Sequence, residues 1–258
     1  MPEGDTILWA ATRMRPVLEG IVPDSIETPL PRHRPDRWPQ RLGGRRIEAI
    51  ETHGKNLFVV FEGDLVLHSH LRMTGMWDVR SLGDRWRRSR NRAWLVLRAG
   101  EQEVIQFDGP VLELMTAGRR RFDQRLTALG PDVLAPEFDR AEFLRRLRST
   151  DQSRGIGDAL LDQRILAGIG NIWKAESCWG AEIDPWRQVG AVSDAEATRL
   201  IELVRPRMLA SGTGGPRSER SRIHGQVGRP CPRCGTAIRS QGQGDENRTT
   251  YWCAACQH

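Results

Sequence analysis

The sequence lacks any long run of apolar residues. Its 258 residues contain no stretch approaching the ~18 consecutive apolar side chains that cross a membrane. The beginning of the chain also lacks the basic segment followed by an apolar stretch that is typical of an export signal. We therefore expect a cytoplasmic protein with no membrane partner. The sequence contains no long internal repeat or low-complexity tract either, and its length suffices for the two domains that we expect.

Lysine is almost absent. Of the 39 basic residues only Lys55 and Lys174 are lysines, and the other 37 are arginines. A lysine can lose its proton when its surroundings lower its pKa, whereas an arginine stays protonated in proteins, so proton transfer favours lysine. Each lysine is therefore a candidate for proton transfer. For either lysine considered alone, the alternative that it is present by chance is about as good an explanation.

Negative charge is scarce in two stretches of the chain. Residues 203–240 contain eight arginines and a single acid, and residues 80–92 contain six arginines and a single acid. With a net charge of +6, such stretches predict a polyanionic partner whose phosphates they neutralise, which makes binding sensitive to salt. The alternative is an arginine-rich solvated surface without a partner.

Cysteine is rare as well, but four of the five cysteines form two closely spaced pairs. Cys231 and Cys234 are separated by two residues, as are Cys253 and Cys256, and eighteen residues lie between the pairs. This spacing is typical of a four-cysteine zinc site, whose closed tetrahedral shell gives one structural ion. Two disulfides are the alternative, which reducing conditions inside a cell disfavour. Cys178 is left over and is expected to be a buried thiol.

The first half of the chain has the patterns of one helix followed by strands. From Asp5 onward, apolar residues recur at helical spacing as far as Leu18, with Asp5 or Thr6 suited to cap the first turn. Short β-branched and aromatic runs then alternate with Gly and Asp, which predicts an antiparallel β-sandwich. These runs are residues 57–61, 65–68, 94–97 and 104–107.

Helical patterns dominate after residues 129–134. They cover residues 141–147 and 156–166, and a capping box from Ser193 to Glu196 precedes a helix that we expect to run through Leu209. Residues 211–216, which contain Gly and Pro, are expected to break this helix. We therefore predict three parts, at residues 1–134, 135–221 and 222–258.

Several motifs in order along the whole chain carry a family resemblance. They are the opening Met-Pro-Glu-Gly-Asp-Thr and residues 53–57, 69–77, 129–134, 160–163, 167–172 and 248–258. With them the chain resembles the formamidopyrimidine-DNA glycosylase and endonuclease VIII family. The resemblance implies an α+β fold with an N-terminal helix and β-sandwich, a helix-two-turn-helix domain and a four-cysteine zinc finger. It also implies a DNA glycosylase and abasic-site lyase of base excision repair, with damaged DNA as partner; we expect a monomer associated with the nucleoid.

The resemblance also assigns catalytic residues. After removal of Met1, the secondary amine of Pro2 would attack C1′ of the damaged nucleoside, with Glu3 as general acid and base. An α-amine titrates near ~8 and a lysine near ~10.4, so at neutral pH the terminus carries the neutral, nucleophilic form far more often. Lys55 would assist base removal, and Arg248 would clasp phosphates beside the lesion during β,δ-elimination.

Further residues match the family's DNA contacts. Arg72, Met73 and Thr74 match a wedge loop that fills the gap left by an extruded nucleotide. Asn171 and the backbone amides of residues 168–171 are expected to hold a phosphate at a helix start. Lys174 is interpreted as a phosphate contact or a surface charge.

The wedge loop and the chain's last residues favour the endonuclease VIII branch, and therefore oxidised pyrimidines as substrates. In the formamidopyrimidine branch, an Arg and a Phe that follow an Asp-Pro form a second wedge, whereas residues 107–112 of this chain read Phe-Asp-Gly-Pro-Val-Leu. A glycosylase directed at 8-oxoguanine or formamidopyrimidine is the alternative. A noncatalytic lesion-binding protein of the same fold, and a zinc-ribbon partner of RNA or the ribosome, are the other hypotheses.

Overall fold

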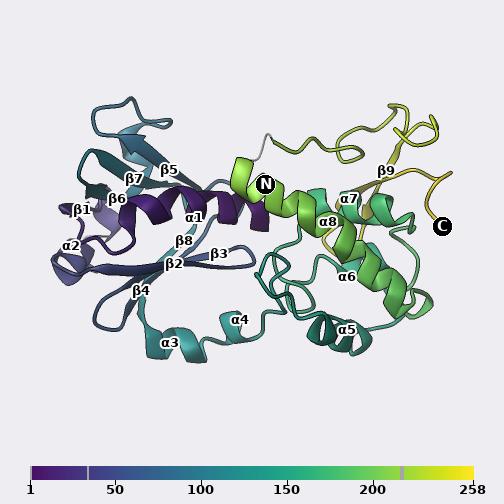
Figure 1. The fold of residues 1–258 in the computed structure, drawn as a ribbon, viewed down its shortest axis with the longest axis horizontal. Helices are drawn as coiled ribbons and strands as arrows, with labels where there is room; N and C mark the ends of the chain where they lie inside the picture. The colour runs from purple at the N-terminus through teal and green to yellow at the C-terminus, as the bar shows by residue number, and fades with distance from the viewer. Residues whose placement is uncertain (1, 34, 216–217) are drawn as a thin grey trace. The chain divides into compact units, whose positions relative to one another are not determined.

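The computed structural model describes residues 2–33, 35–215 and 218–258 (Figure 1). Contacts between residues divide the chain into two compact units: Pro2 with Thr6–Thr127, and Glu3–Asp5 with Ala128–His258. The finer division into three parts stays a prediction. No helix among the described residues has both the length and the apolar character needed to cross a membrane.

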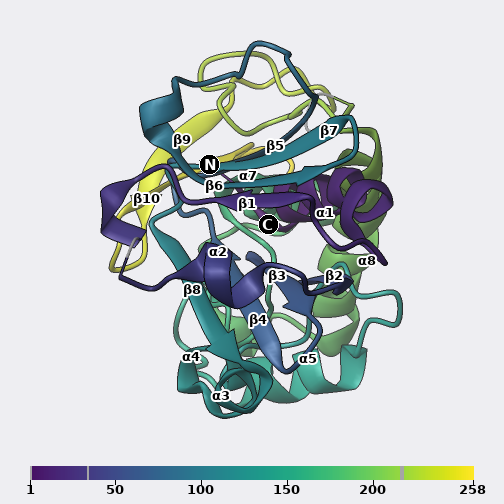
Figure 2. The same ribbon diagram turned by 90° about the vertical axis from the view of Figure 1, so that its left-hand side faces the viewer.

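The first unit contains two four-stranded sheets, in which every pairing of neighbouring strands is antiparallel. Figure 2 shows them as separate layers. This confirms the predicted sandwich, and the four predicted runs are β3, β4, β6 and β7. One sheet has the order β1 (Ser25–Glu27), β6 (Ala93–Ala99), β7 (Gln102–Phe107), β5 (Met76–Ser81), and the other β2 (Ile47–His53), β3 (Asn56–Phe61), β4 (Leu65–His70), β8 (Val111–Thr116).

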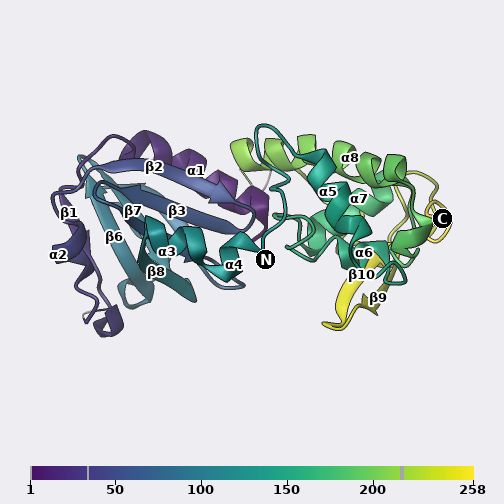
Figure 3. The ribbon, with the colours of Figure 1, turned by 90° about the horizontal axis from the view of Figure 1, so that it is seen from below.

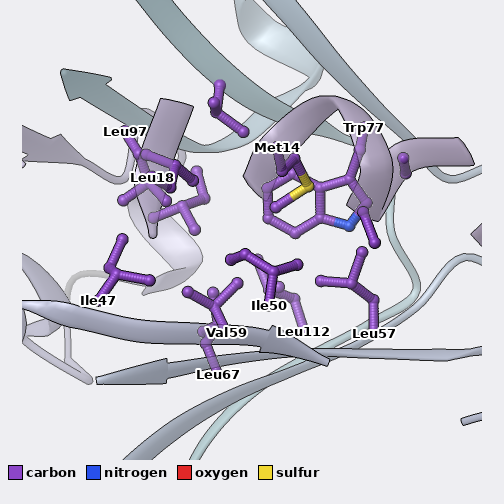
Figure 4. Packing of buried hydrophobic residues seen from close by; sticks show 14 of the residues in the cluster. Met14, Leu18, Ile47, Ile50, Leu57, Val59, Leu67, Trp77, Leu97 and Leu112 are labelled. Carbon is purple, nitrogen blue, oxygen red and sulfur yellow. The ribbon is translucent and has the colours of Figure 1, made fainter. Parts of the chain in front are cut away.

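Helix α1 (Gly4–Leu18) supplies the apolar face predicted for it. Met14 and Leu18 are fully buried and pack in one cluster with side chains from the sheets, such as Leu57, Val59 and Leu67 (Figure 4). Burying side chains of this size contributes about 1.5–3 kcal/mol each. Asp5 and Thr6 lie inside the helix, so the predicted cap at these residues is wrong.

Short helical segments lie between the strands of the first unit or follow its last strand. None of them carries a predicted site residue. They are η1 (Pro31–His33), α2 (Trp38–Leu42), η2 (Arg90–Arg92), α3 (Ala117–Phe122) and α4 (Gln124–Thr127).

The second unit is mainly helical. Helix α7 (Asn171–Ala181) packs against α8 (Asp194–Gly214) and against the last strand of a two-stranded hairpin (Figure 3). The remaining elements are α5 (Arg140–Arg148), α6 (Ile156–Ala159), η3 (Val189–Ala191), β9 (Arg239–Gln243) and β10 (Arg248–Trp252).

Two helix boundaries differ from the prediction in this unit. The capping box is confirmed, with the Ser193 hydroxyl accepting from the Glu196 amide and the Glu196 carboxylate accepting in return. The helix then continues to Gly214, beyond its expected end. The predicted helix over residues 156–166 is wrong: α6 ends at Ala159, and the Asp162 carboxylate binds the Arg164 amide at 3.0 Å, which favours a turn over a continuing helix.

Candidate functional site

The side chain of Glu3 lies at the N-terminal end of α7. It is 1% exposed, and its carboxylate accepts hydrogen bonds from the backbone amides of Gly170 (2.9 Å), Ile172 (2.8 Å) and Trp173 (3.3 Å). These amides have no partner inside the helix, and the positive end of the helix dipole favours a negative charge. Our prediction that the amides of residues 168–171 are free to hold a phosphate is therefore wrong for Gly170, whose amide binds the protein's own carboxylate. It is also wrong for Gly168, whose amide donates to Gln163 Oε1 at 3.0 Å.

Two glycines permit this close approach. A Cβ on Gly170 would lie 2.4 Å from the carboxyl carbon of Glu3, closer than real Cβ atoms come. Gly168 has φ 104°, a conformation that side chains rarely adopt, and its carbonyl accepts from the Gly4 amide at 2.9 Å. Gly168 and Gly170 therefore allow residues 3 and 4 to pack against the start of α7.

The start of the chain is also held by α8. The Ser211 hydroxyl donates to the Asp5 carboxylate at 2.6 Å, and both residues are buried. This contact could not be predicted from the sequence, because the residues are 206 positions apart. Pro2, which precedes Glu3, is half-buried, and Met1 lies outside the described residues.

Lys174 does not lie at the surface. Its side chain is fully buried one turn into α7, and its ammonium donates to the Thr250 hydroxyl and to Gln243 Oε1 at 3.4 Å. Burial lowers the pKa of Lys174 to about 8. The interpretation of Lys174 as a surface charge or phosphate contact is therefore wrong: it joins α7 to the hairpin. The helical pattern of α7 gave no warning, since the residues that cover Lys174 come from another part of the chain.

The four predicted cysteines meet beside the hairpin. The sulfur atoms of Cys231, Cys234, Cys253 and Cys256 all lie within 4.8 Å of one another. Tetrahedral coordination with metal–sulfur bonds of ~2.3 Å places sulfurs at such separations, so the donor set fits one ion. The pairs at 3.5 and 4.0 Å are too far apart for disulfides. Cys178 is fully buried as expected, and burial raises the pKa of its thiol to about 12.

Asn171 and Arg248 come together at the start of α7. The Asn171 side-chain amide donates to the backbone carbonyl of Thr249 at 2.7 Å, and Arg248 is the preceding residue of β10. Arg248 is half-buried and pairs with the exposed Glu246 at 2.6 Å. The second unit therefore gathers Glu3, Asn171 and Arg248 around one helix end.

In the first unit, Lys55 lies in the turn between β2 and β3. His53 pairs with Asn56, so the turn has two residues, and Gly54 at its first position has φ 58°. Asn56 in turn pairs with His70 on β4, which brings the lysine turn beside the end of that strand.

His70 is a residue that the sequence reasoning missed. Its ring nitrogen Nδ1 accepts from the Arg72 amide at 3.1 Å, which links it to the wedge motif. Burial, followed by the charge of Arg72, lowers the pKa of His70 to about 4, so the ring is neutral at pH 7. The signal was present, because His70 lies inside the motif at residues 69–77.

The wedge motif forms an exposed loop. Arg72, Met73 and Thr74 are all exposed, and Met73 is 62% exposed although it is apolar. Arg72 has φ 49°, and the Gly75 amide closes the loop on the Leu71 carbonyl at 2.8 Å. The structure thus presents one unbranched apolar side chain at the tip of a closed turn.

Part of the arginine-rich stretch from residue 203 onward has internal partners. Arg205 donates to the carbonyls of residues 133, 135 and 136, and Arg207 pairs with the buried Glu176 at 2.8 Å. Glu176 also accepts from the amides of residues 222–224. These two arginines are therefore structural, whereas Arg220, Arg222 and Arg229 line an open hollow at the surface.

Two family models match the chain. Residues 1–125 match the formamidopyrimidine-DNA glycosylase N-terminal domain, and residues 129–213 match the formamidopyrimidine-DNA glycosylase H2TH domain.

Curated relatives align with the whole of the chain. A probable endonuclease 8 2 of Streptomyces coelicolor is 38% identical over 100% of this chain and 94% of its own length. The DNA-(apurinic or apyrimidinic site) lyase Nei2 of Mycolicibacterium smegmatis is 32% identical, covering 100% and 99%. Endonuclease 8 of Escherichia coli is 29% identical, covering 100% of both chains.

Solved structures share the fold. Lactococcus lactis Fpg (MutM) in complex with DNA containing N7-benzyl-Fapy-dG superposes with a TM-score of 0.84 at 24% identity, covering 100% of both chains. A MutM complex with DNA containing carbocyclic 8-oxo-G has a TM-score of 0.83 at 24% identity and the same coverage.

Proposed function

This chain belongs to the formamidopyrimidine-DNA glycosylase family, and from that premise we propose how its residues act as a DNA glycosylase and abasic-site lyase of base excision repair. The activity follows from the family match and from full-length relatives named endonuclease 8 and abasic-site lyase. The proposed roles depend above all on the Glu3 carboxylate, which three backbone amides hold directly after Pro2.

In the proposed reaction Pro2 is the nucleophile. Once Met1 is removed, its secondary amine attacks C1′, the bond from C1′ to the damaged base breaks, and an iminium joins the protein to the sugar. The amide donors favour the ionised form of Glu3, so this carboxylate can take a proton from the attacking amine and return it to the sugar oxygen as the ring opens.

Lys55 and Arg248 are the other two residues to which we assign catalytic roles. Lys55 lies at the tip of a tight turn and can approach the leaving base and a phosphate as a compact point charge. Arg248 and Asn171 adjoin the helix end that holds Glu3, and we assign them to the phosphates beside the lesion. Successive β- and δ-eliminations would then leave a one-nucleotide gap with phosphate ends.

We propose zinc as the ion of the four-cysteine cluster. Four thiolates leave no open position for substrate, so the ion would hold the hairpin that carries Arg248 and take no part in catalysis. We also propose that the protein acts as a monomer. Because its substrate is damaged DNA, it would be associated with the nucleoid in the cytoplasm.

Oxidised pyrimidines are the proposed substrate class. Support comes from the residues after β7, Asp108-Gly109-Pro110, which lack the Arg and Phe of a second wedge. The full-length relatives named endonuclease 8 support the same branch. The alternative, activity on 8-oxoguanine or formamidopyrimidine, is distinguished by offering duplexes with single defined lesions of each kind.

Borohydride trapping tests the proposal. Reduction during turnover on lesion-containing duplex is expected to crosslink protein and DNA covalently, and mass spectrometry of the digested conjugate should locate the sugar on Pro2. A protein that cleaves lesion DNA while yielding no crosslink at Pro2, or one whose active form retains Met1, would contradict the mechanism.

A further inference from the structure

The residues that replace the second wedge are themselves well organised. Asp108 has φ 46°, and its amide donates to the Arg92 carbonyl at 3.1 Å. Its carboxylate accepts from Arg92 Nε at 3.0 Å and from Arg88, and its side chain is 20% exposed. A non-glycine residue in this conformation costs free energy, so surrounding contacts must hold it.

These contacts reach the wedge loop, residues 71–75. Nη1 of Arg88 donates to the backbone carbonyl of Thr74 at 2.6 Å and to the Asp108 carboxylate. The Thr74 hydroxyl donates in turn to the Asp108 carbonyl at 3.1 Å. Two separate links thus join the wedge loop to the loop after β7.

The segment that supplies Arg88 is anchored as well. The Trp86 indole donates to the Glu103 carboxylate at 2.8 Å, and its ring packs edge-on against Phe107 with centroids 5.8 Å apart. Arg88 therefore extends from a fixed point, and the base of the wedge loop is held while Met73 at its tip stays exposed.

We propose that Arg88 and Asp108 are positioning residues that brace the wedge loop. The inference rests on the proposed function, in which Met73 enters the base stack as a nucleotide is extruded. Unstacking a nucleotide costs a few kcal/mol, which contacts between Met73 and the neighbouring bases must offset. A loop that changes its conformation on contact with DNA would lose part of this compensation. In this chain the loop after β7, which carries the second wedge in the formamidopyrimidine branch, instead stabilises the wedge loop. Arg88 and Asp108 therefore act through that loop and not by contact with the reacting atoms.

The test compares an abasic site in duplex with the same site in single-stranded DNA, where no partner strand has to be displaced. Arg88→Gln and Asp108→Asn are each expected to lower cleavage of the duplex about tenfold, the effect of losing one charge-assisted hydrogen bond, while cleavage of the single strand is unchanged. The double variant should lose little more than either single variant, because both break one brace. Fluorescence of a 2-aminopurine beside the lesion, measured in a Glu3→Gln background, should report less unstacking.

Arg85→Gln is the matched control. It removes the same charge from the same segment, but the Arg85 side chain is exposed, so the ratio of duplex to single-strand cleavage should stay at its wild-type value. Equal losses on both DNAs, or variants with the wild-type ratio and fluorescence, would overturn the brace. A wild-type protein that cleaves neither DNA would instead refute the proposed function.

Discussion

Three backbone amides donate hydrogen bonds to the carboxylate of Glu3. The donors are amides at a helix start, whose positions the helix itself determines, so the carboxylate cannot drift without breaking several hydrogen bonds. A general acid and base must be held within reach of the reacting atoms, and backbone donors do this without the rotamer freedom of side chains.

Glu3→Gln is expected to separate an enzyme from a lesion-binding protein. Loss of proton transfer should lower base removal at least about 100-fold while DNA binding persists. The new side-chain NH₂ would also face amide donors, which should lower the free energy of unfolding by about 1–3 kcal/mol. Single-turnover cleavage, a gel-shift assay and urea unfolding measure the three effects. Glu137→Gln, at an exposed acid, is the control, and equal cleavage by both variants would favour a noncatalytic role for Glu3.

The buried Lys174 leads to a prediction about the stability of the protein at alkaline pH. Its pKa is about 8 in the folded protein and 10.5 in the unfolded chain, so between these values the unfolded chain binds more protons and stability rises with pH. Relative to Lys174→Met, the wild type should gain about 3 kcal/mol in free energy of unfolding from pH 8 to 10.5, and nothing below pH 8. Urea unfolding of both proteins across this range provides the measurement. A constant difference would mean that the ammonium reaches solvent.

At the scale of elements, α7 organises the second unit. Its start holds Glu3, its first turn carries Asn171 and Lys174 toward the hairpin, and its length packs on α8. One short helix therefore connects the start of the chain with the hairpin that carries Arg248. Gly170 at its N-cap and Gly180 near its C-terminal end have different surroundings: Gly170 lies against Glu3, whereas the space around Gly180 is open enough for a methyl group.

Gly170→Ala is expected to reduce cleavage, whereas Gly180→Ala is expected to raise stability and leave cleavage unchanged. A methyl group at Gly170 would displace the Glu3 carboxyl group, so cleavage should fall to about the level of Glu3→Gln. At Gly180 the nearest atom to an added Cβ is 3.7 Å away, and alanine should stabilise the helix by about 0.5–1 kcal/mol without loss of activity. Cleavage assays and thermal unfolding distinguish the pair. Full activity of the Gly170 variant would contradict the close packing of Glu3.

At the scale of the whole molecule, the sandwich has its own apolar core, whereas we expect the hairpin to depend on an ion held by the cysteine cluster. The small cluster around the cysteines includes only a few apolar residues, such as Ile223 and Ile238. Such a small core does not offset the entropy of ordering a long segment, so a bound ion is expected to provide the difference.

Metal removal should therefore affect one part of the molecule. The purified protein is expected to contain one zinc per chain, and Cys253→Ser should lose the zinc, the protection of residues 231–256 from hydrogen exchange, and most of the DNA affinity. Exchange in the sandwich core should stay unchanged. Elemental analysis and hydrogen exchange provide the readouts, with Cys178→Ala as the control that keeps its zinc. Tight DNA binding by metal-free protein would refute the role of the ion.

The sequence alone determined the features that depend on neighbouring residues. The helix over α1, the capping box of α8, four strands and the four-cysteine spacing were all predicted correctly, because each follows from periodicity or from chemistry within one turn or one hairpin. Strands β2, β5 and β8 were missed because polar residues interrupt their apolar patterns, and only their pairing identifies them.

Tertiary structure alone decided the surroundings of the key side chains. Glu3 finds its amides about 170 positions along the chain, and Lys174 is buried by residues some 70 positions away. Whether an amide is free for phosphate, or a lysine carries its charge at the surface, depends on which distant segments pack there. Sequence patterns name the groups capable of chemistry, whereas long-range packing sets their partners, their protonation and their freedom to move.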